Sequence, residues 1–417
     1  MTVATNPNLV RDSSLLVDLS PGDIRSFDQR ENLIQYSEQF DNAYWVKSNC
    51  VVTANAGMAP NGTITADAMT ESTDASVQFH NVATGSVTLT AGNYYTMSVY
   101  VKGAGNFNTT YNGVEIAGLA GGANFNLNTQ NINFNFGTTT ASSITDVGNG
   151  WYYLTVTCLI ATTTTYTMFV QLSTAIGNTN YQGTGALRLY VWGAQLERSS
   201  TATPYNQTVG STFTRSTTYT NLAVAGSYNG TIGGNVVYDN TGAGSMLFNN
   251  TGTNTISLAT IPDTVWNAGS WTLSVWFRPT VINRTQYDDN TLLSHGTTAV
   301  NNGLHIGERS RVLFFGMYGN DSYGVTPISA NQWCHATFTF DYTLKQKQIF
   351  LNGVFDGGGG SVGYGGTGGN TELGRQWGGT TSNRLTGYLG RVQIYTRVLT
   401  ASEIVRNFTS MRGRYGI

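Results

Sequence analysis

The stretch from residue 332 to residue 354 constrains the fold more than any other part of the chain. Its first ten residues alternate between two faces, one formed by Cys334, Ala336, Phe338 and Phe340 and the other by Trp333, His335, Thr337 and Thr339. That alternation predicts a β-strand with one buried face. A polar turn at residues 342–345 leads to a second strand ending at Leu351, and Asn352-Gly353 is a signal for a further tight turn. The segment therefore predicts antiparallel hairpins.

The composition agrees with a β-rich chain. Charged residues make up only 11% of the 417 residues, while glycine contributes 50 of them and Thr and Asn are abundant throughout. A chain of this length has room for two or three domains. The formal net charge is −2 and no basic run occurs, which argues against a nucleic-acid partner. We expect an all-β protein with many turns and few short helices.

The cysteines and the amino-terminal residues indicate whether the protein is secreted or inserted into a membrane. The three cysteines, Cys50, Cys158 and Cys334, lie in apolar alternating stretches, which favours burial as small apolar side chains over a disulfide framework. The first residues lack the charged and apolar regions of a signal peptide, and no apolar run is long enough to cross a membrane. We expect neither a secretory leader nor membrane insertion.

Four sequence motifs in the carboxy-terminal half are similar to motifs of a known family. They are the hairpin around Trp333, His335, Asp341, Asn352 and Gly353, the strand 270–279, the strand 389–395, and the segment 397–404 with a capping box between Thr400 and Glu403. Together they resemble the laminin-G-like, concanavalin A-like jelly roll. The resemblance implies a β-sandwich that ends in a short docked helix.

Residues 32–215 resemble a second family. Strands rich in alternating apolar residues recur there, for example at Tyr95, Met97, Val99 and Val101, and Gly- and Asn-rich turns separate them. Their sequences resemble the carbohydrate-binding-module-like jelly roll of tailed-bacteriophage tail-fibre and virion surface proteins. The resemblance is carried by segments 32–45, 60–68, 92–102, 189–197 and 201–205. The resemblance implies a separate β-sandwich and a place on a phage particle.

The order of the segments predicts an interrupted domain. Ser14 to Leu19 reads as a first strand of the laminin-G-like domain, but its continuation appears only at residues 220–232. We therefore predict that residues 1–31 supply this strand and an anchoring arm, that residues 32–215 form an inserted sandwich, and that residues 216–417 complete the first domain. Val17 should then share a sheet with the carboxy-terminal domain. A flexible arm before two domains in series is the alternative.

The sequence offers little for catalysis. Glycosidases of this sandwich type, by family resemblance, carry Glu-x-Asp-x-x-Glu on one strand, and hydrolysis needs two carboxylates flanking the bond. Here Glu308, Glu372 and Glu403 are isolated, and Asp288 and Asp289 would face opposite ways on a strand. His295 and His305 are weak candidates for a metal site shared across a hairpin, because zinc needs three or four ligands. We expect no enzyme activity.

Rim loops with aromatic and polar residues are better candidates, because such loops bind saccharides by stacking and hydrogen bonding. The candidate contacts for a glycan or protein partner are Tyr287, Asp288, Tyr318, Asn320, Asp321, Tyr323, Tyr364 and Trp377. For any single one of them, an ordinary solvated loop residue is the favoured interpretation. Trp151, Trp192, Trp271 and Trp276 lie on predicted strands and are expected in the core. We expect no cofactor, except that calcium is a candidate ligand of Asp288, Asp289 and Asp321.

These observations favour a structural or adhesive protein of a tailed-phage virion, either a head decoration or a tail fibre or knob. Such a protein is assembled in the cytoplasm of the host bacterium and contacts other virion proteins and cell-surface or environmental glycans, normally as a homo-oligomer. A polysaccharide depolymerase and a secreted bacterial lectin are the alternatives. The sequence leaves open the glycan, the oligomeric state and the choice between head and tail.

Overall fold

The computed structural model describes residues 9–23, 25–73, 76–104, 113–118, 120–174, 178–223, 227–239, 243–249, 254–258, 260–282, 289–360, 363–376 and 383–417. Over these residues the chain consists of antiparallel β-sheets and two helices. This confirms the predicted all-β class with two antiparallel jelly-roll sandwiches and few helices. Neither helix of the described residues is long and apolar enough to span a membrane.

The chain divides into two compact units. Unit 1 comprises Met1–Gln29 and Ser216–Ile417, and unit 2 comprises Arg30–Arg215. The chain therefore begins in unit 1, forms unit 2 and then returns to unit 1. Each unit has its own sheets and its own apolar core.

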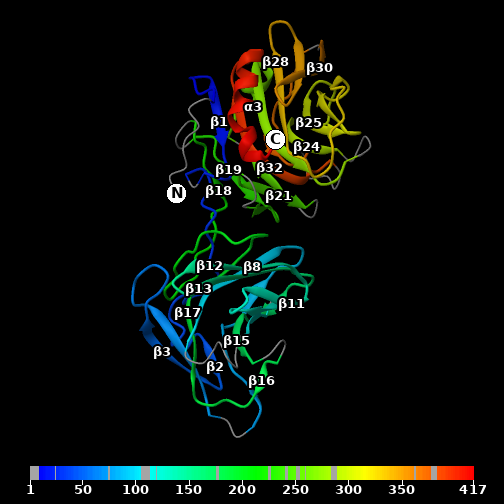
Figure 1. Ribbon diagram of the computed structural model, residues 1–417. Coiled ribbons are helices and arrows are strands. Elements are labelled where there is room, and N and C mark those ends of the chain that lie inside the picture. Colours follow the sequence, from blue (N-terminus) through cyan, green and yellow to red (C-terminus); the bar gives the residue numbers. More distant parts are fainter. Residues whose placement is uncertain are drawn as a thin grey trace. The chain divides into compact units, whose positions relative to one another are not determined.

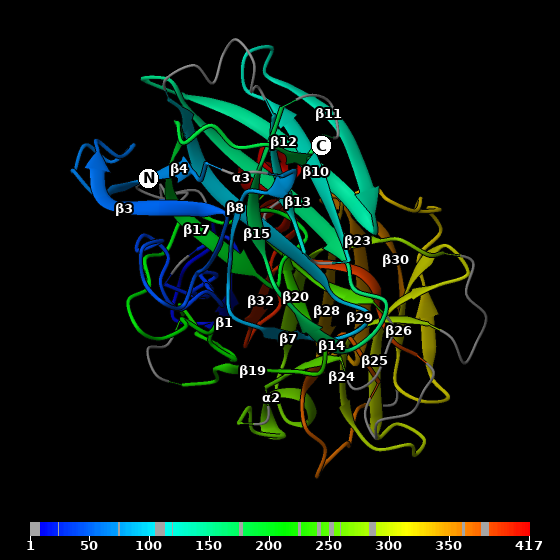
Figure 2. The ribbon, with the colours of Figure 1, turned by 90° about the horizontal axis from the view of Figure 1, so that it is seen from below.

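Two eight-stranded sheets form unit 1, and Figure 2 shows strands of each as separate layers. The first sheet contains β1 (Leu15–Leu19), β20 (Val237–Asp239), β21 (Ser245–Asn249), β23 (Trp271–Pro279), β28 (Cys334–Asp341), β29 (Gln346–Leu351), β30 (Val354–Gly360) and β32 (Thr386–Tyr395). The second contains β18 (Thr218–Tyr219), β19 (Gly230–Gly233), β22 (Thr255–Ser257), β24 (Asn290–Gly296), β25 (Gly303–Arg309), β26 (Val312–Gly316), β27 (Asp321–Tyr323) and β31 (Glu372–Leu373). The short helix α2 (Thr264–Asn267) precedes β23.

The first strand of the chain lies in the first sheet of unit 1. Strand β1 pairs with β32, with Val17 opposite Ile394, while β21 pairs with an earlier part of β32, with Met246 opposite Leu389. Because β23 occupies the other edge of β32 along most of its length, β1 and β21 follow one another along the same edge. Strand β1, which precedes unit 2 in the sequence, and strand β21, which follows it, thus both pair with β32.

Strand β28 is buried on both faces, so the expectation of a single buried face is wrong. Phe338 lies in the core of unit 1 as predicted, but Thr337 on the opposite face is also fully buried. Helix α3 (Ala401–Tyr415) covers that face (Figure 1), and His335 and Trp276 stack on the helix residues Phe408 and Tyr415. The periodicity of a strand depends only on local alternation, so it cannot predict that a helix distant in the sequence covers the second face.

The start of α3 has the predicted capping box. The Thr400 hydroxyl accepts a hydrogen bond from the Glu403 backbone N–H, and the Glu403 carboxylate accepts one from the Thr400 N–H. Arg397 also pairs with Glu403 at 2.6 Å. These bonds satisfy amide groups that a helix terminus would otherwise leave without partners, and they fix where the helix begins.

Unit 2 is a sandwich of two six-stranded sheets. One sheet contains β2 (Val46–Ser48), β6 (Asn81–Ala83), β9 (Gly113–Ala117), β10 (Gly121–Asn126), β11 (Asn131–Gly137) and β15 (Phe169–Ser173). The other contains β3 (Cys50–Gly57), β4 (Ala66–Glu71), β8 (Tyr94–Gly103), β12 (Thr139–Gly148), β13 (Trp151–Leu159) and β17 (Leu187–Glu197). Two smaller ladders pair β7 (Val87–Leu89) with β14 (Thr164–Tyr166) and β5 (Gln78–Phe79) with β16 (Asn180–Tyr181).

The cores confirm the strand faces that the sequence predicts. Tyr95, Met97, Val99 and Val101 all line the core of unit 2. The four tryptophans expected inside, Trp151, Trp192, Trp271 and Trp276, are buried. The three cysteines are free and buried, as expected for small apolar side chains.

Candidate functional site

A hairpin at the rim of unit 1 brings four of the predicted contacts together. Strands β26 and β27 are joined by a tight turn in which the Met317 N–H donates to the Asn320 carbonyl at 3.2 Å. The turn and β27 carry Tyr318, Asn320, Asp321 and Tyr323. Tyr318 and Tyr323 are 38% and 44% exposed. We call these four residues together with Arg309 the Tyr318–Tyr323 surface.

Tyr318 sits in a backbone conformation that aromatic residues rarely adopt. Its φ is +49°, and that of the following Gly319 is +83°. A tight hairpin with positive φ at both central positions normally carries Asn or Gly, because a Cβ there crowds the backbone. Strain of this kind persists only where the surroundings enforce it, and it concentrates at functional positions.

Lys347 holds the turn in place from the opposite sheet. Its Nζ donates to the Asn320 carbonyl at 2.7 Å and to the Asn320 side-chain oxygen at 3.1 Å. The side chain is fully buried, and this burial lowers the pKa of Lys347 from 10.5 to about 8. The chain thus places a desolvated cation beneath an exposed tyrosine turn.

Arg309 organises the other end of the surface. Its Nε and Nη2 each lie 2.8 Å from one oxygen of Asp289, a bidentate arrangement, while Nη1 reaches Asp321 at 3.0 Å and the Tyr323 hydroxyl at 2.9 Å. The guanidinium carbon lies 4.4 Å from the ring centroid of Phe314. Charge-assisted bonds of this geometry are strong and directional. They fix Tyr323 and Asp321 relative to each other.

His305 fills the space between the two strands on the same face. A Cβ placed on Gly316 would lie 2.5 Å from His305 Nε2 and 2.9 Å from Asp321 Oδ1, so only glycine leaves room for the imidazole there. Burial lowers the pKa of His305 from its ordinary value, which keeps the ring neutral at physiological pH. The ring lies 6.3 Å from that of Tyr318 and packs under the turn.

The two described carboxylates proposed for calcium are bound by Arg309. Asp289 and Asp321 both accept hydrogen bonds from its guanidinium, which therefore lies between them. No group of three His, Cys, Asp or Glu side chains suited to a metal ion occurs among the described residues. Asp288, the third candidate, lies outside the described residues, as do Tyr287 and Trp377.

Tyr364 is not part of the surface, so its assignment as a partner contact is corrected. Only 3% of the residue is exposed, and it belongs to the core of unit 1. Its hydroxyl lies 2.9 Å from His295 Nδ1, and His295 Nε2 lies 3.0 Å from Asp263. The flanking glycines suggested an exposed loop, but this hydrogen-bonded chain draws the ring inward.

The two histidines considered for a metal site point to opposite faces of the β24–β25 ladder. In the register, Ser294 lies opposite His305 and His295 lies opposite Leu304, so the histidines alternate across the sheet. His295 contacts Tyr364 and Asp263 on the inner side, and His305 contacts Phe314 on the outer side. The structure therefore does not bring these two weak candidates together for a shared metal site.

The isolated glutamates are engaged in structural bonds. Glu308 accepts from the Asn290 side chain and from the Arg311 backbone, and Glu372 forms an ion pair with Arg375 at 2.6 Å. Glu403 belongs to the helix cap described above. Each of the three carboxylates is therefore bonded to a donor within the protein.

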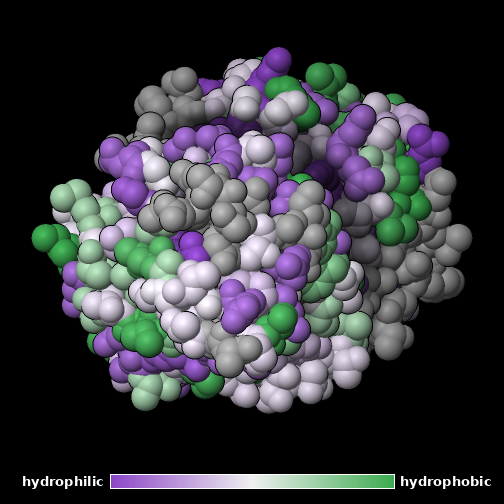
Figure 3. Space-filling view, turned by 60° about the horizontal axis from the view of Figure 1, so that its bottom comes forward, coloured by the Kyte–Doolittle hydropathy of each residue, from purple (hydrophilic) through white to green (hydrophobic). Residues whose placement is uncertain are grey.

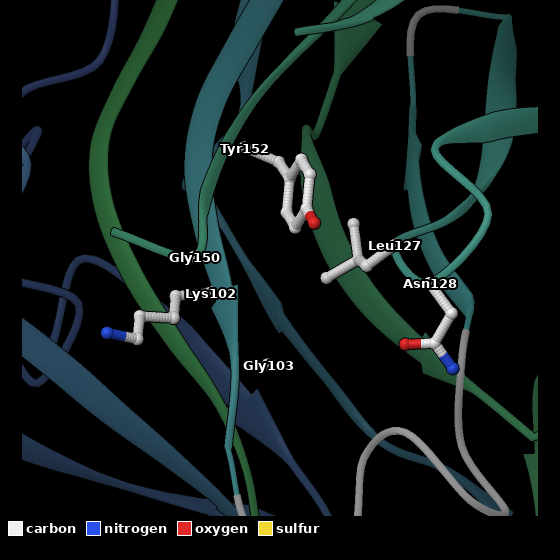
Figure 4. Close-up of a pocket in the computed structure, with 6 residues that line it drawn as sticks. All are labelled: Lys102, Gly103, Leu127, Asn128, Gly150 and Tyr152. Carbon is white, nitrogen blue, oxygen red and sulfur yellow. The ribbon is translucent and has the colours of Figure 1, made fainter. Parts of the chain in front are cut away.

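Unit 2 has a cavity of about 460 Å³ between the end of β8 and the turn that joins β10 to β11. Tyr152, Leu127 and Asn128 are among its lining residues. In Figure 4 the Tyr152 hydroxyl points toward Leu127 and Asn128, whereas the Lys102 ammonium points away from them. The cavity therefore lacks the convergent polar groups that characterise a built ligand site.

Large apolar patches are a further type of interaction site. Among the coloured residues of the face in Figure 3, apolar residues form small separate groups between polar ones. Scattered apolar groups of this kind are ordinary for a protein surface.

Three residues of the site escaped the sequence-based prediction. Arg309, Phe314 and Lys347 lie on strands β25, β26 and β29, and nothing in their local sequence marks them as site residues. Their roles depend on partners that sheet pairing brings near. The unusual Tyr-Gly pair at 318–319 between two short strands was the one available signal.

Comparison with known proteins agrees with the architecture of unit 1. Residues 250–405, all within unit 1, match the family model described as the concanavalin A-like lectin/glucanases superfamily. A search of curated protein sequences finds no match.

Solved structures give distant likenesses. Domain 4 of an extracellular arabinanase from Geobacillus stearothermophilus, in complex with arabinotriose, is 20% identical over 42% of this chain and 81% of that chain, with a TM-score of 0.33. The IT-sialidase CBM40 of Ruminococcus gnavus, bound to alpha2,3 sialyllactose, is 18% identical over 39% and 94%, with a TM-score of 0.33. The botulinum neurotoxin serotype G binding domain is 16% identical over 44% and 47%, with a TM-score of 0.36, so this chain spans about half its length.

Proposed function

We propose that the protein is a glycan-binding adhesive protein and that unit 1 binds its ligand on the Tyr318–Tyr323 surface. The observation that carries the proposal is the pair of half-exposed tyrosines held by Arg309 and Lys347. Tyrosine rings offer an apolar face to the C–H groups of a sugar and a hydroxyl to its polar edge. A site whose side chains are fixed before binding loses little conformational entropy when the ligand arrives.

Binding without cleavage fits the carboxylates of this face. Hydrolysis of a glycosidic bond needs one carboxyl group as acid and a second as base or nucleophile on either side of the bond. Asp289 and Asp321 are instead both bonded to one guanidinium. We therefore propose that the protein does not hydrolyse the glycans it binds.

A glycan array probed with the whole protein tests the proposal, followed by an assay for new reducing ends on every glycan retained. The expected result is retention of a restricted set of saccharides with no release of reducing ends. Retention of none would contradict glycan binding, and release of reducing ends would favour a depolymerase.

We further propose a place on a tailed-phage particle, as a head decoration or a tail fibre or knob that contacts other virion proteins as a homo-oligomer. Support comes from the resemblance of residues 32–215 to jelly rolls of phage surface proteins. Mass spectrometry of purified particles from the source of this sequence tests this placement. Absence of its peptides from intact particles would contradict it.

A further inference from the structure

The charged groups of the Tyr318–Tyr323 surface differ in how far they reach solvent. The Arg309 side chain is 9% exposed and that of its partner Asp289 only 1%. Lys347 is completely buried beneath the turn. The Asp321 side chain, at 18%, is the most exposed of the four charged side chains.

Both cations are committed to partners inside the protein. Arg309 donates to both oxygens of Asp289, to Asp321 and to the Tyr323 hydroxyl, and its plane covers Phe314. Lys347 donates twice to Asn320. A ligand arriving at the two tyrosines therefore meets neither cation as a free donor.

Asp321 is only partly satisfied. Its Oδ2 accepts from Arg309, whereas its Oδ1 is buried and has no hydrogen-bond partner among the described residues. The neighbouring His305 is buried and neutral, so it adds no positive charge beside this oxygen. The charged side chain of this surface that reaches solvent furthest is thus a carboxylate.

We propose that Asp321 is a specificity-determining residue that makes this surface select neutral saccharides and reject those that carry a carboxylate. A second carboxylate near Asp321 would be repelled, whereas a sugar hydroxyl is uncharged and is tolerated there. This inference rests on the proposed glycan binding and names the ligand class of the same surface.

The test uses matched pairs of probes that differ only in charge. Oligogalacturonate, oligoalginate and hyaluronan oligosaccharides are each compared with the same oligosaccharide after reduction of its carboxyl groups. For the pair that the wild-type protein binds, the neutral member should bind at least about fivefold more tightly, the size expected of one like-charge contact in water. In Asp321→Asn this preference should shrink to within about twofold, since no repulsion remains.

Two further measurements separate charge from folding. Asp146→Asn makes the same charge change at an exposed position of unit 2 and should leave the preference unchanged. In the wild-type protein, raising the salt from 50 to 500 mM should strengthen binding of the acidic probe relative to the neutral one, because salt screens the repulsion. This second measurement needs no variant and holds even if Asp321→Asn unfolds.

Each contrary result has its own meaning. Equal or tighter binding of the acidic member by the wild-type protein would overturn the inference. A preference that survives in folded Asp321→Asn would remove Asp321 from the role. Failure to bind either member of every pair, by a protein that retains other glycans on the array, would overturn the inference alone. Retention of no glycan at all would overturn the inference together with the proposed glycan binding.

Discussion

At the scale of single residues, neighbours on one strand are expected to differ sharply in their effect on stability. Phe338 lies in the core of unit 1, so Phe338→Ala should lower the free energy of unfolding by about 3–5 kcal/mol. Thr337 is buried under α3 with a hydroxyl that has no partner among the described residues. Thr337→Val keeps the shape and removes that hydroxyl, so it should be neutral or stabilising. Denaturant unfolding compares them, and a large loss in Thr337→Val would reveal an undetected bond.

Lys347 gives the protein a characteristic dependence of stability on pH. Burial lowers the pKa of Lys347 to about 8, whereas the unfolded chain keeps the ordinary value of 10.5. Between these values the unfolded state binds more protons, so this residue makes the free energy of unfolding rise from about pH 8 toward pH 10.5. Lys347→Met should lack that rise. Superimposable pH profiles of the two proteins in urea would contradict a buried, charged Lys347.

At the scale of elements, the helix cap is open to a matched test. Thr400→Ala removes the hydroxyl that accepts from the Glu403 backbone, which should cost about 1 kcal/mol. Thr409→Ala makes the same chemical change at an exposed position inside α3 and should be neutral or slightly favourable, since alanine is the better helix former. Equal losses by thermal melting would show that the cap does not stabilise α3.

The same elements show what the sequence could and could not predict. The alternation around Phe338 and the Thr400–Glu403 pair are local patterns, and both match the structure. The second buried face of β28 was missed because it is created by a helix remote in sequence. The Arg309–Asp289 pair was missed for a similar reason, since it depends on how β25 pairs with its neighbour. Local sequence therefore predicts faces and caps, whereas the site depends on tertiary partners.

At the scale of the whole molecule, the chain leaves and re-joins unit 1 through adjacent segments. In unit 2 Asn32 and Phe213 exchange two backbone hydrogen bonds of 2.8 Å, and in unit 1 the Thr220 N–H donates to Ser26 at 2.6 Å. Ends that lie together tolerate insertion and excision. Replacing residues 30–215 by a short Gly-Ser linker should therefore leave unit 1 folded, with one cooperative melting transition.

The control for that excision removes β1 as well. Strand β1 pairs with β32, and its buried Asp18 forms an ion pair with Arg391 in the same sheet. Loss of residues 9–23 would leave Arg391 buried without its carboxylate, which is costly. The shortened chain should lose cooperative melting, and a cooperative transition without β1 would make the first strand dispensable.

The central claim, that two tyrosines on a fixed turn bind the ligand, is tested most directly by one affinity measurement. Tyr318→Ala/Tyr323→Ala is titrated with a glycan that the wild-type protein retains, beside Tyr342→Ala, which removes another exposed tyrosine of unit 1. The double variant should lose about 2 kcal/mol or more of binding free energy, as anchor residues do, with little change in melting temperature. Tyr342→Ala should bind like the wild-type protein. Undiminished affinity in a folded double variant would contradict the claim.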